Sequence, residues 1–171
     1  FVQVSPADDD GNHSFGLTHD HVQAMVAKAR VVIAEVNDSV PYTFGEAMLP
    51  ASKIDCAVHV SRIPSPVMPT TASETDEAIA KIIANYVEDG SVLQVGVGAI
   101  PDAVMRLSRD RKDLGVHSGM IGDGYVDLVE AGVMTNARKP FDTGIGIAGA
   151  LIGSKRLFDH AHKNKAIRMC S

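Results

Sequence analysis

The chain has 171 residues, enough for one ordinary domain or parts of two, and its 45% hydrophobic and 22% charged residues are typical of a protein with a buried core. Its net charge of −5, without a block of Lys or Arg, argues against a nucleic-acid partner, because binding phosphates requires clustered cations. No apolar run approaches a membrane span and no signal-peptide pattern is present, so we expect no membrane partner.

The first third of the chain predicts strands around one helix. Alternating apolar residues predict a strand at 1–5, and apolar runs predict two more within 30–37 and 53–62. Between them, the i, i+3, i+4, i+7 spacing predicts a helix over 19–30 whose apolar face consists of Val22, Met25, Val26 and Ala29. The opening strand lacks an initiator Met, so we expect a fragment of a longer protein.

Three prolines between 62 and 73 interrupt any periodicity, so we place a linker at 67–73, between segments 1–66 and 74–171. Ser73 with Asp76 three residues later predicts a helix N-terminus. The apolar face of that helix is predicted to consist of Ala78, Ile79, Ile82, Ile83, Tyr86 and Val87.

The second segment then alternates strands and helices. Strands are expected at 91–98, 113–118 and 143–153. Pro101 is expected to open one helix at its first position, and Gly132 to stop the helix that begins near Tyr125. This alternation predicts an α/β fold with a mostly parallel sheet flanked by helices.

Ligands of such sheets bind at the carboxyl ends of the strands, which places "GVGAIP" (96–101) and "HSGMIGDG" (117–124) on one functional edge. Gly96 and Gly98 would let the backbone approach a ligand, and the helix that follows favours anions. Pro101 occupies the third glycine position of a dinucleotide fingerprint, so that motif is not met. A tight turn without a ligand is the alternative.

Histidines near the N-terminus do not form a standard metal pattern. The run 19–21 ("HDH"), with His13 nearby, lacks zinc spacing and a helical i, i+4 pair, so we interpret it as a solvated helix start and expect no metal.

The pair His117 and Ser118 does not indicate a serine hydrolase. Adjacent strand residues point to opposite faces, and Val116 and Met120 stand where the G-x-S-x-G elbow needs glycines. Asp123 is interpreted as a helix cap rather than an acid or base.

Charged residues elsewhere are interpreted as solvated surface. They comprise Asp127, the run 109–113 and the region 130–139. The two cysteines, Cys56 and Cys170, are too few for a disulfide framework, which favours a cytoplasmic protein.

Taken together, several segments in order resemble the acetyl-CoA hydrolase/transferase family, and within it 4-hydroxybutyrate and acetyl-CoA:acid CoA-transferases. They are 2–16 ("VQVSPADDDGNHSFG"), 32–38 ("VIAEVND"), 93–104 ("LQVGVGAIPDAV"), 113–136 ("DLGVHSGMIGDGYVDLVEAGVMTN") and 153–159 ("GSKRLFD"). The resemblance implies parts of two similar α/β domains: 1–66 is the tail of the first and 74–171 the front part of the second.

The resemblance also implies chemistry. In this family a glutamate attacks an acyl-CoA thioester, an acyl anhydride and then a glutamyl-CoA thioester form, and coenzyme A passes to a short-chain carboxylic acid. Oxyanion donors would supply much of the rate. Family members are expected to be homo-oligomers.

The family's glutamate lies in an H-S-E-M segment that here reads His117-Ser118-Gly119-Met120, so the nucleophile position is Gly119. The resemblance assigns the binding of coenzyme A and substrate to Gly96, Gly98, Ile100, Pro101, His117 and Met120. Three hypotheses stay open: a transferase that has lost its nucleophile, a paralogue or scaffold that binds coenzyme A without transferring it, or the use of another carboxylate such as Asp123. Lys155 and Arg156 could offset the acidic charge toward the polyanionic coenzyme A, or be solvated surface.

Overall fold

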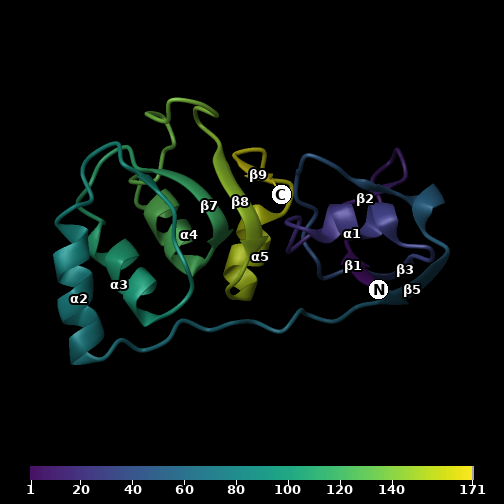
Figure 1. Ribbon diagram of the computed structural model, residues 1–171, viewed down its shortest axis with the longest axis horizontal. Coiled ribbons are helices and arrows are strands. Elements are labelled where there is room, and N and C mark those ends of the chain that lie inside the picture. The colour runs from purple at the N-terminus through teal and green to yellow at the C-terminus, as the bar shows by residue number, and fades with distance from the viewer. Residues whose placement is uncertain (171) are drawn as a thin grey trace.

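The computed structural model describes residues 1–170 and contains two separate parallel sheets (Figure 1). The first sheet has the order β1-β3-β5, and a two-stranded antiparallel ladder joins β2 to β4. Elements of this part are β1 (Val2–Val4), β2 (Asn12–His13), α1 (Val22–Lys28), β3 (Ile33–Asn37), β4 (Leu49–Pro50), a 3-10 turn (Ala51–Lys53) and β5 (Cys56–Val60).

The second sheet has four parallel strands in the order β6-β7-β8-β9, which is also their order along the chain. Its elements are α2 (Glu74–Ala84), β6 (Val92–Leu93), α3 (Ala99–Leu107), β7 (Gly115–Ile121), α4 (Asp123–Glu130), β8 (Gly146–Leu151), α5 (Lys155–Ala161) and β9 (Ile167–Met169). Because each crossover helix joins neighbouring strands with the usual right-handed connection, α3, α4 and α5 share one face of this sheet. The predicted α/β class with parallel sheets is confirmed.

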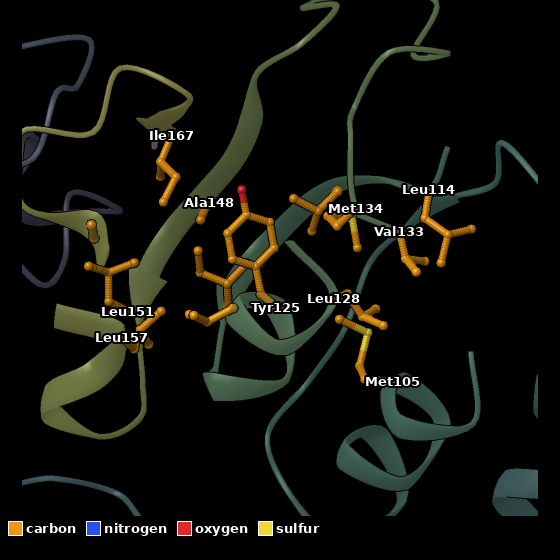
Figure 2. Packing of buried hydrophobic residues seen from close by; sticks show 14 of the residues in the cluster. Met105, Leu114, Tyr125, Leu128, Val133, Met134, Ala148, Leu151, Leu157 and Ile167 are labelled. Carbon is orange, nitrogen blue, oxygen red and sulfur yellow. The ribbon is translucent and has the colours of Figure 1, made fainter. Parts of the chain in front are cut away.

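The larger core lies between this sheet and its helices. Tyr125 of α4 lies beside Ala148 of β8, and Leu128 of α4 lies beside Met105 of α3, as Figure 2 shows, and all four are buried. A smaller cluster of buried residues belongs to the first sheet; its members are Val2, Val4, Phe15, Val32, Ala34, Val36 and Leu49.

Two segments of the first part continue the second sheet. The amide of His19 donates to the carbonyl of Gly149 at 2.9 Å, and Thr18 bridges Ala150. On the far side, Gly45 bridges Met169 beyond β9. Loop segments of the first part are therefore bonded to the second sheet through their backbone.

Helix starts and stops follow their local signals. Ser73 and Asp76 form a complete capping box on α2, as predicted. Gly132 has φ +71° directly after α4, the left-handed conformation for which glycine is favoured. Residues 61–72 contain neither helix nor strand and run beneath the molecule from β5 to α2 (Figure 1).

Three predicted elements need correction. The first helix is shorter than 19–30, and none of its residues is fully buried. The α2 residues of the predicted apolar face are mostly exposed, because the buried stripe is Ala80, Ala84 and, one turn beyond, Val87. Pro101 is the third residue of α3 rather than the first, since Gly98 caps the helix and its carbonyl accepts from the amide of Asp102.

The strand of the H-S-G-M segment was also predicted too short. It does not end at Ser118 but runs on to Ile121, so Gly119 lies within β7. In the part of the chain that the structure describes, no helix is long and apolar enough to cross a membrane.

Candidate functional site

Gly119 lies on an open face of β7. A Cβ added there would meet no non-neighbouring heavy atom of residues 1–170 within 4 Å. His117 is exposed, and because residues two apart in a strand point to the same side, its side chain shares this face. The opposite face, toward the helices, carries the buried Val116 and Ser118.

Ser118 ties β7 to the segment that follows β6. Its hydroxyl accepts a hydrogen bond from the amide of Val95 at 3.0 Å and donates one to the carbonyl of the same residue at 2.9 Å. The pairing of β6 with β7 ends at Leu93, so this side chain continues the link by one further contact. Ser118 therefore has a structural role and positions the glycine loop beside Gly119.

The glycine loop runs from Gly96 to Gly98 and ends at the N-terminus of α3. Gly98 has φ +131°, a conformation that L side chains rarely adopt, and a Cβ there would meet no non-neighbouring atom of the described residues within 4 Å. Ile100 and Pro101 are the second and third helical residues and are half-buried. The first-turn amides are the kind of donors that accommodate anionic groups.

One carboxyl group lies in this first turn. Burial raises the pKa of Asp102, and the nearby charge of Asp123 raises it further. A raised pKa means that this environment disfavours the negative charge of Asp102, which would otherwise compete with an anionic ligand for the helix N-terminus.

Gly149 of β8 lies next to Gly119 of β7. A Cβ on Gly149 would stand only 2.8 Å from the carbonyl oxygen of Gly119, so the two strands approach closely there because residue 149 is glycine. Met120 is half-buried and pairs with Ala150 on the same two strands.

The rim beside His117 comes from the loop before β8. The exposed ring of Phe141 makes an edge contact with the His117 ring, with centroids 5.5 Å apart. Asp142 in the same loop forms an ion pair with Arg168 of β9. The sequence analysis did not identify Phe141 or Gly149, because the loop before β8 and the register of β8 against β7 bring them beside residues 117 and 119. It did not identify Arg168 either, which lies on β9, one strand further, opposite Ile147.

Lys139 corrects the prediction that 130–139 is solvated surface. Its ammonium is buried and donates to the carbonyls of Val116 at 3.0 Å and Ile145 at 2.7 Å. Burial lowers the pKa of Lys139. The side chain holds the Phe141 loop against the open face of the sheet.

Asp123 behaves as the predicted cap, but for a different helix. Its two carboxylate oxygens accept from the amide of Ser154 at 2.8 Å and from its hydroxyl at 2.6 Å, at the start of α5. Both oxygens are thus engaged, which disfavours Asp123 as a replacement for the missing glutamate.

Lys155 and Arg156 lie on the exposed part of α5. Lys155 pairs with Asp159, and Arg156 pairs with Asp127 and Glu130. These cations already have carboxylate partners, which agrees with the surface interpretation given for Asp127.

His19 corrects the prediction of a solvated helix start. It is buried, its Nε2 lies 3.3 Å from Thr43 Oγ1, and burial lowers its pKa to about 4 although Glu46 acts in the opposite direction. His13 is buried as well, and its Nδ1 lies 2.8 Å from the carbonyl of Ser5, whereas His21 is exposed. Among residues 1–170, no group of three His, Cys, Asp or Glu side chains could hold a metal ion.

Comparison with known proteins places this arrangement among CoA-transferases. The structure superimposes on the crystal structure of 4-hydroxybutyrate CoA-transferase from Porphyromonas gingivalis with a TM-score of 0.93 and 34% identity, covering 99% of this chain and 43% of that one. RipA from Yersinia pestis matches with the same TM-score and identity over 98% of this chain and 39% of its own.

The sequence comparisons agree. The 4-hydroxybutyrate coenzyme A transferase of Clostridium kluyveri is 38% identical over 99% of this chain and 40% of its own length. Residues 1–69 match the model of the acetyl-CoA hydrolase/transferase N-terminal domain. The chain belongs to the acetyl-CoA hydrolase/transferase family, and it spans about 40% of the length of the relatives it matches.

Proposed function

We propose that the protein carrying this chain has the scaffold of a CoA-transferase, which moves coenzyme A between a short-chain acyl-CoA and a carboxylic acid. The names of its relatives support this: they include a 4-hydroxybutyrate and a butyryl-CoA:acetate CoA-transferase. The observation that carries the proposal is the open, outward-facing position 119 beside the Gly96–Gly98 loop. A glutamate there would stand free of contacts on the functional edge of the sheet.

With a glutamate at position 119, its carboxylate would attack the thioester carbonyl carbon and form a mixed anhydride as the thiolate leaves. The returning thiolate would give a glutamyl-CoA thioester and free acid, and an acceptor acid would reverse both steps. The amides of the loop and of the first turn of α3 are suited to the developing oxyanion or to the phosphates of coenzyme A. Gly119 has no carboxylate, so glutamyl transfer is impaired in the chain as written.

A second candidate function is a paralogue that binds coenzyme A without transferring it, or a scaffold domain. Gly119 itself favours this candidate. Calorimetry with coenzyme A separates its two forms, because a paralogue binds the ligand and a scaffold does not.

The remaining assignments belong to the same proposal. The helix- and strand-free run 61–72 supports a division at 67–73 into the tail of one domain and the front part of another. Two free cysteines support a cytoplasmic location. Exposed apolar side chains on α2, such as Ile82, offer a surface for a homo-oligomer.

The test is CoA exchange from butyryl-CoA to labelled acetate, measured in the protein that carries this chain with Gly119, with Gly119→Glu and with Gly119→Gln. We expect exchange with glutamate alone, since glutamine has the same shape without the nucleophile. Mass spectrometry should find coenzyme A attached to the peptide that contains residue 119. Failure of the Gly119→Glu protein to exchange any short acyl-CoA and acid pair would refute the transferase proposal.

A further inference from the structure

We propose that with Gly119 the site transfers the acyl group to water, and that His117 is the general base of this thioester hydrolysis. The inference rests on the proposed function, because it needs an acyl-CoA bound at the edge formed by β7 and the glycine loop. It assigns an activity and a catalytic residue to the chain as it stands.

The open face of Gly119 admits a water molecule where a nucleophilic side chain would otherwise stand. Residue 119 is exposed, and the position of its missing Cβ has no non-neighbouring atom of the described residues within 4 Å. On the β8 side, Gly149 has no side chain that would occupy the space next to Gly119. A thioester presented to this position meets solvent rather than a carboxylate.

His117 has the geometry of a base for that water. Residues two apart in a strand are separated by about 6.6 Å, so a water between the imidazole and the space above Gly119 lies within hydrogen-bond reach of the ring. The imidazole shares the exposed face of Gly119, and the Phe141 ring contacts it edge-on at 5.5 Å. Lys139 holds the loop that carries Phe141.

The neighbouring alternatives are already engaged by other groups. Ser118 faces the helices with its hydroxyl bonded to Val95, and Asp123 accepts two hydrogen bonds from Ser154. Glu46 follows Gly45, which pairs with β9, and the side chain of Glu46 is engaged by Cys170. His117 is the titratable side chain that β7 itself presents on this face.

The step balances with water as the sole co-reactant. The water oxygen bonds to the thioester carbonyl carbon while a water proton moves to an imidazole nitrogen of His117. The tetrahedral oxyanion collapses, the carbon–sulfur bond breaks, and the thiolate takes the proton back from the imidazolium. One thioester and one water give one carboxylic acid and one CoA thiol.

The experiment measures thiol release from butyryl-CoA without any acceptor acid, in the protein that carries this chain and in ¹⁸O-labelled water. We expect one ¹⁸O per acid released with Gly119. The His117→Gln variant should lower kcat by about 10²- to 10⁴-fold, the usual contribution of a general base, with KM little changed. The matched variant His59→Gln, at an exposed histidine on β5, should change kcat less than twofold.

Each other outcome is decisive. Absence of thiol release with Gly119, while Gly119→Glu exchanges coenzyme A, overturns the hydrolysis and leaves the proposed transferase intact. Hydrolysis that survives His117→Gln but is lost in Glu46→Gln overturns the assignment of the base. Hydrolysis with Gly119 and no exchange with Gly119→Glu upholds the inference and refutes the transferase, whereas loss of both activities refutes both. Calorimetry with coenzyme A checks that His117→Gln still folds and binds.

Discussion

The two parallel sheets of this chain differ in how completely the described chain buries them. The β6–β9 sheet lies under crossover helices and shares with them a cluster of twenty buried hydrophobic residues, whereas the cluster of the β1-β3-β5 sheet has seven. Strand β5 of the smaller sheet is exposed along almost its whole length. The candidate site stands on the better packed sheet, as expected for a site that needs its side chains held in place.

The largest expected effect comes from shortening one apolar side chain in each part of the chain. Leu128→Ala removes a fully buried side chain of α4 and should lower the free energy of unfolding by about 2–5 kcal/mol, because it leaves a cavity. Val58→Ala on the exposed β5 should cost less than about 0.5 kcal/mol. Urea unfolding measures both, and equal losses would show that the smaller sheet is buried in solution.

A second test addresses the junction between the sheets. Burial holds the pKa of His19 at about 4, below the 6.5 of an exposed histidine, so the unfolded chain takes up the proton first as the pH falls. The stabilisation is fully present above pH 6.5 and is lost progressively toward pH 4, by roughly 3 kcal/mol in all.

Urea unfolding between pH 7 and 4 should show this loss. In His19→Gln, the dependence of the unfolding free energy on pH should become less steep, by an amount that corresponds to the uptake of about one proton. Glu46, the neighbouring charge that opposes the shift, supplies the control Glu46→Gln, which should leave a slope of the same sign. An unchanged slope in His19→Gln would mean that other groups carry the acid sensitivity.

A third test weakens the link between the glycine loop and β7. Ser118→Ala leaves the amide of Val95 without its partner, and the carbonyl of Val95 keeps only the Gln94 side chain, so the change should cost about 1–3 kcal/mol. Ser91→Ala, which removes one exposed hydrogen bond to the amide of Glu88, should cost less. Thermal unfolding compares the two, and an equal cost would show that Ser118 is not a tether.

The same sheet shows which features the sequence makes predictable. Parallel topology, the capping box at Ser73 and the stop at Gly132 depend on residues close together in the chain, and all three were predicted. The burial of Lys139 and His19 depends on carbonyls and side chains brought there by distant segments, so local polarity gave the wrong answer.

The site divides in the same way. Residues 96–101 and 117–120 could be singled out because glycines and a family motif mark them, and the bonds from Ser118 to Val95 place the two stretches side by side. Phe141 and Gly149 have no local signal, since Gly149 meets Gly119 through the register of β8 against β7 and Phe141 meets His117 from the loop before β8. For α2 the periodicity was right but the phase was wrong, because small alanines pack closely against a neighbouring helix while the larger Ile82 and Tyr86 remain exposed.

The smallest expected change in stability concerns α2, which has the fewest buried residues among the helices that belong to the second part of the chain. With much of its apolar surface exposed, this helix depends on its capping box more than a packed helix would, and Ser73→Ala should cost about 1 kcal/mol. Hydrogen exchange should show faster amides at 77–84 and unchanged amides in β7, since local fraying of α2 does not open the sheet. Ser73→Asp, which can still accept from the amide of Asp76, should restore part of the protection. If the β7 amides also exchange faster in Ser73→Ala, α2 and the sheet unfold as one unit. The exposed face of α2 must then be packed against another surface in solution.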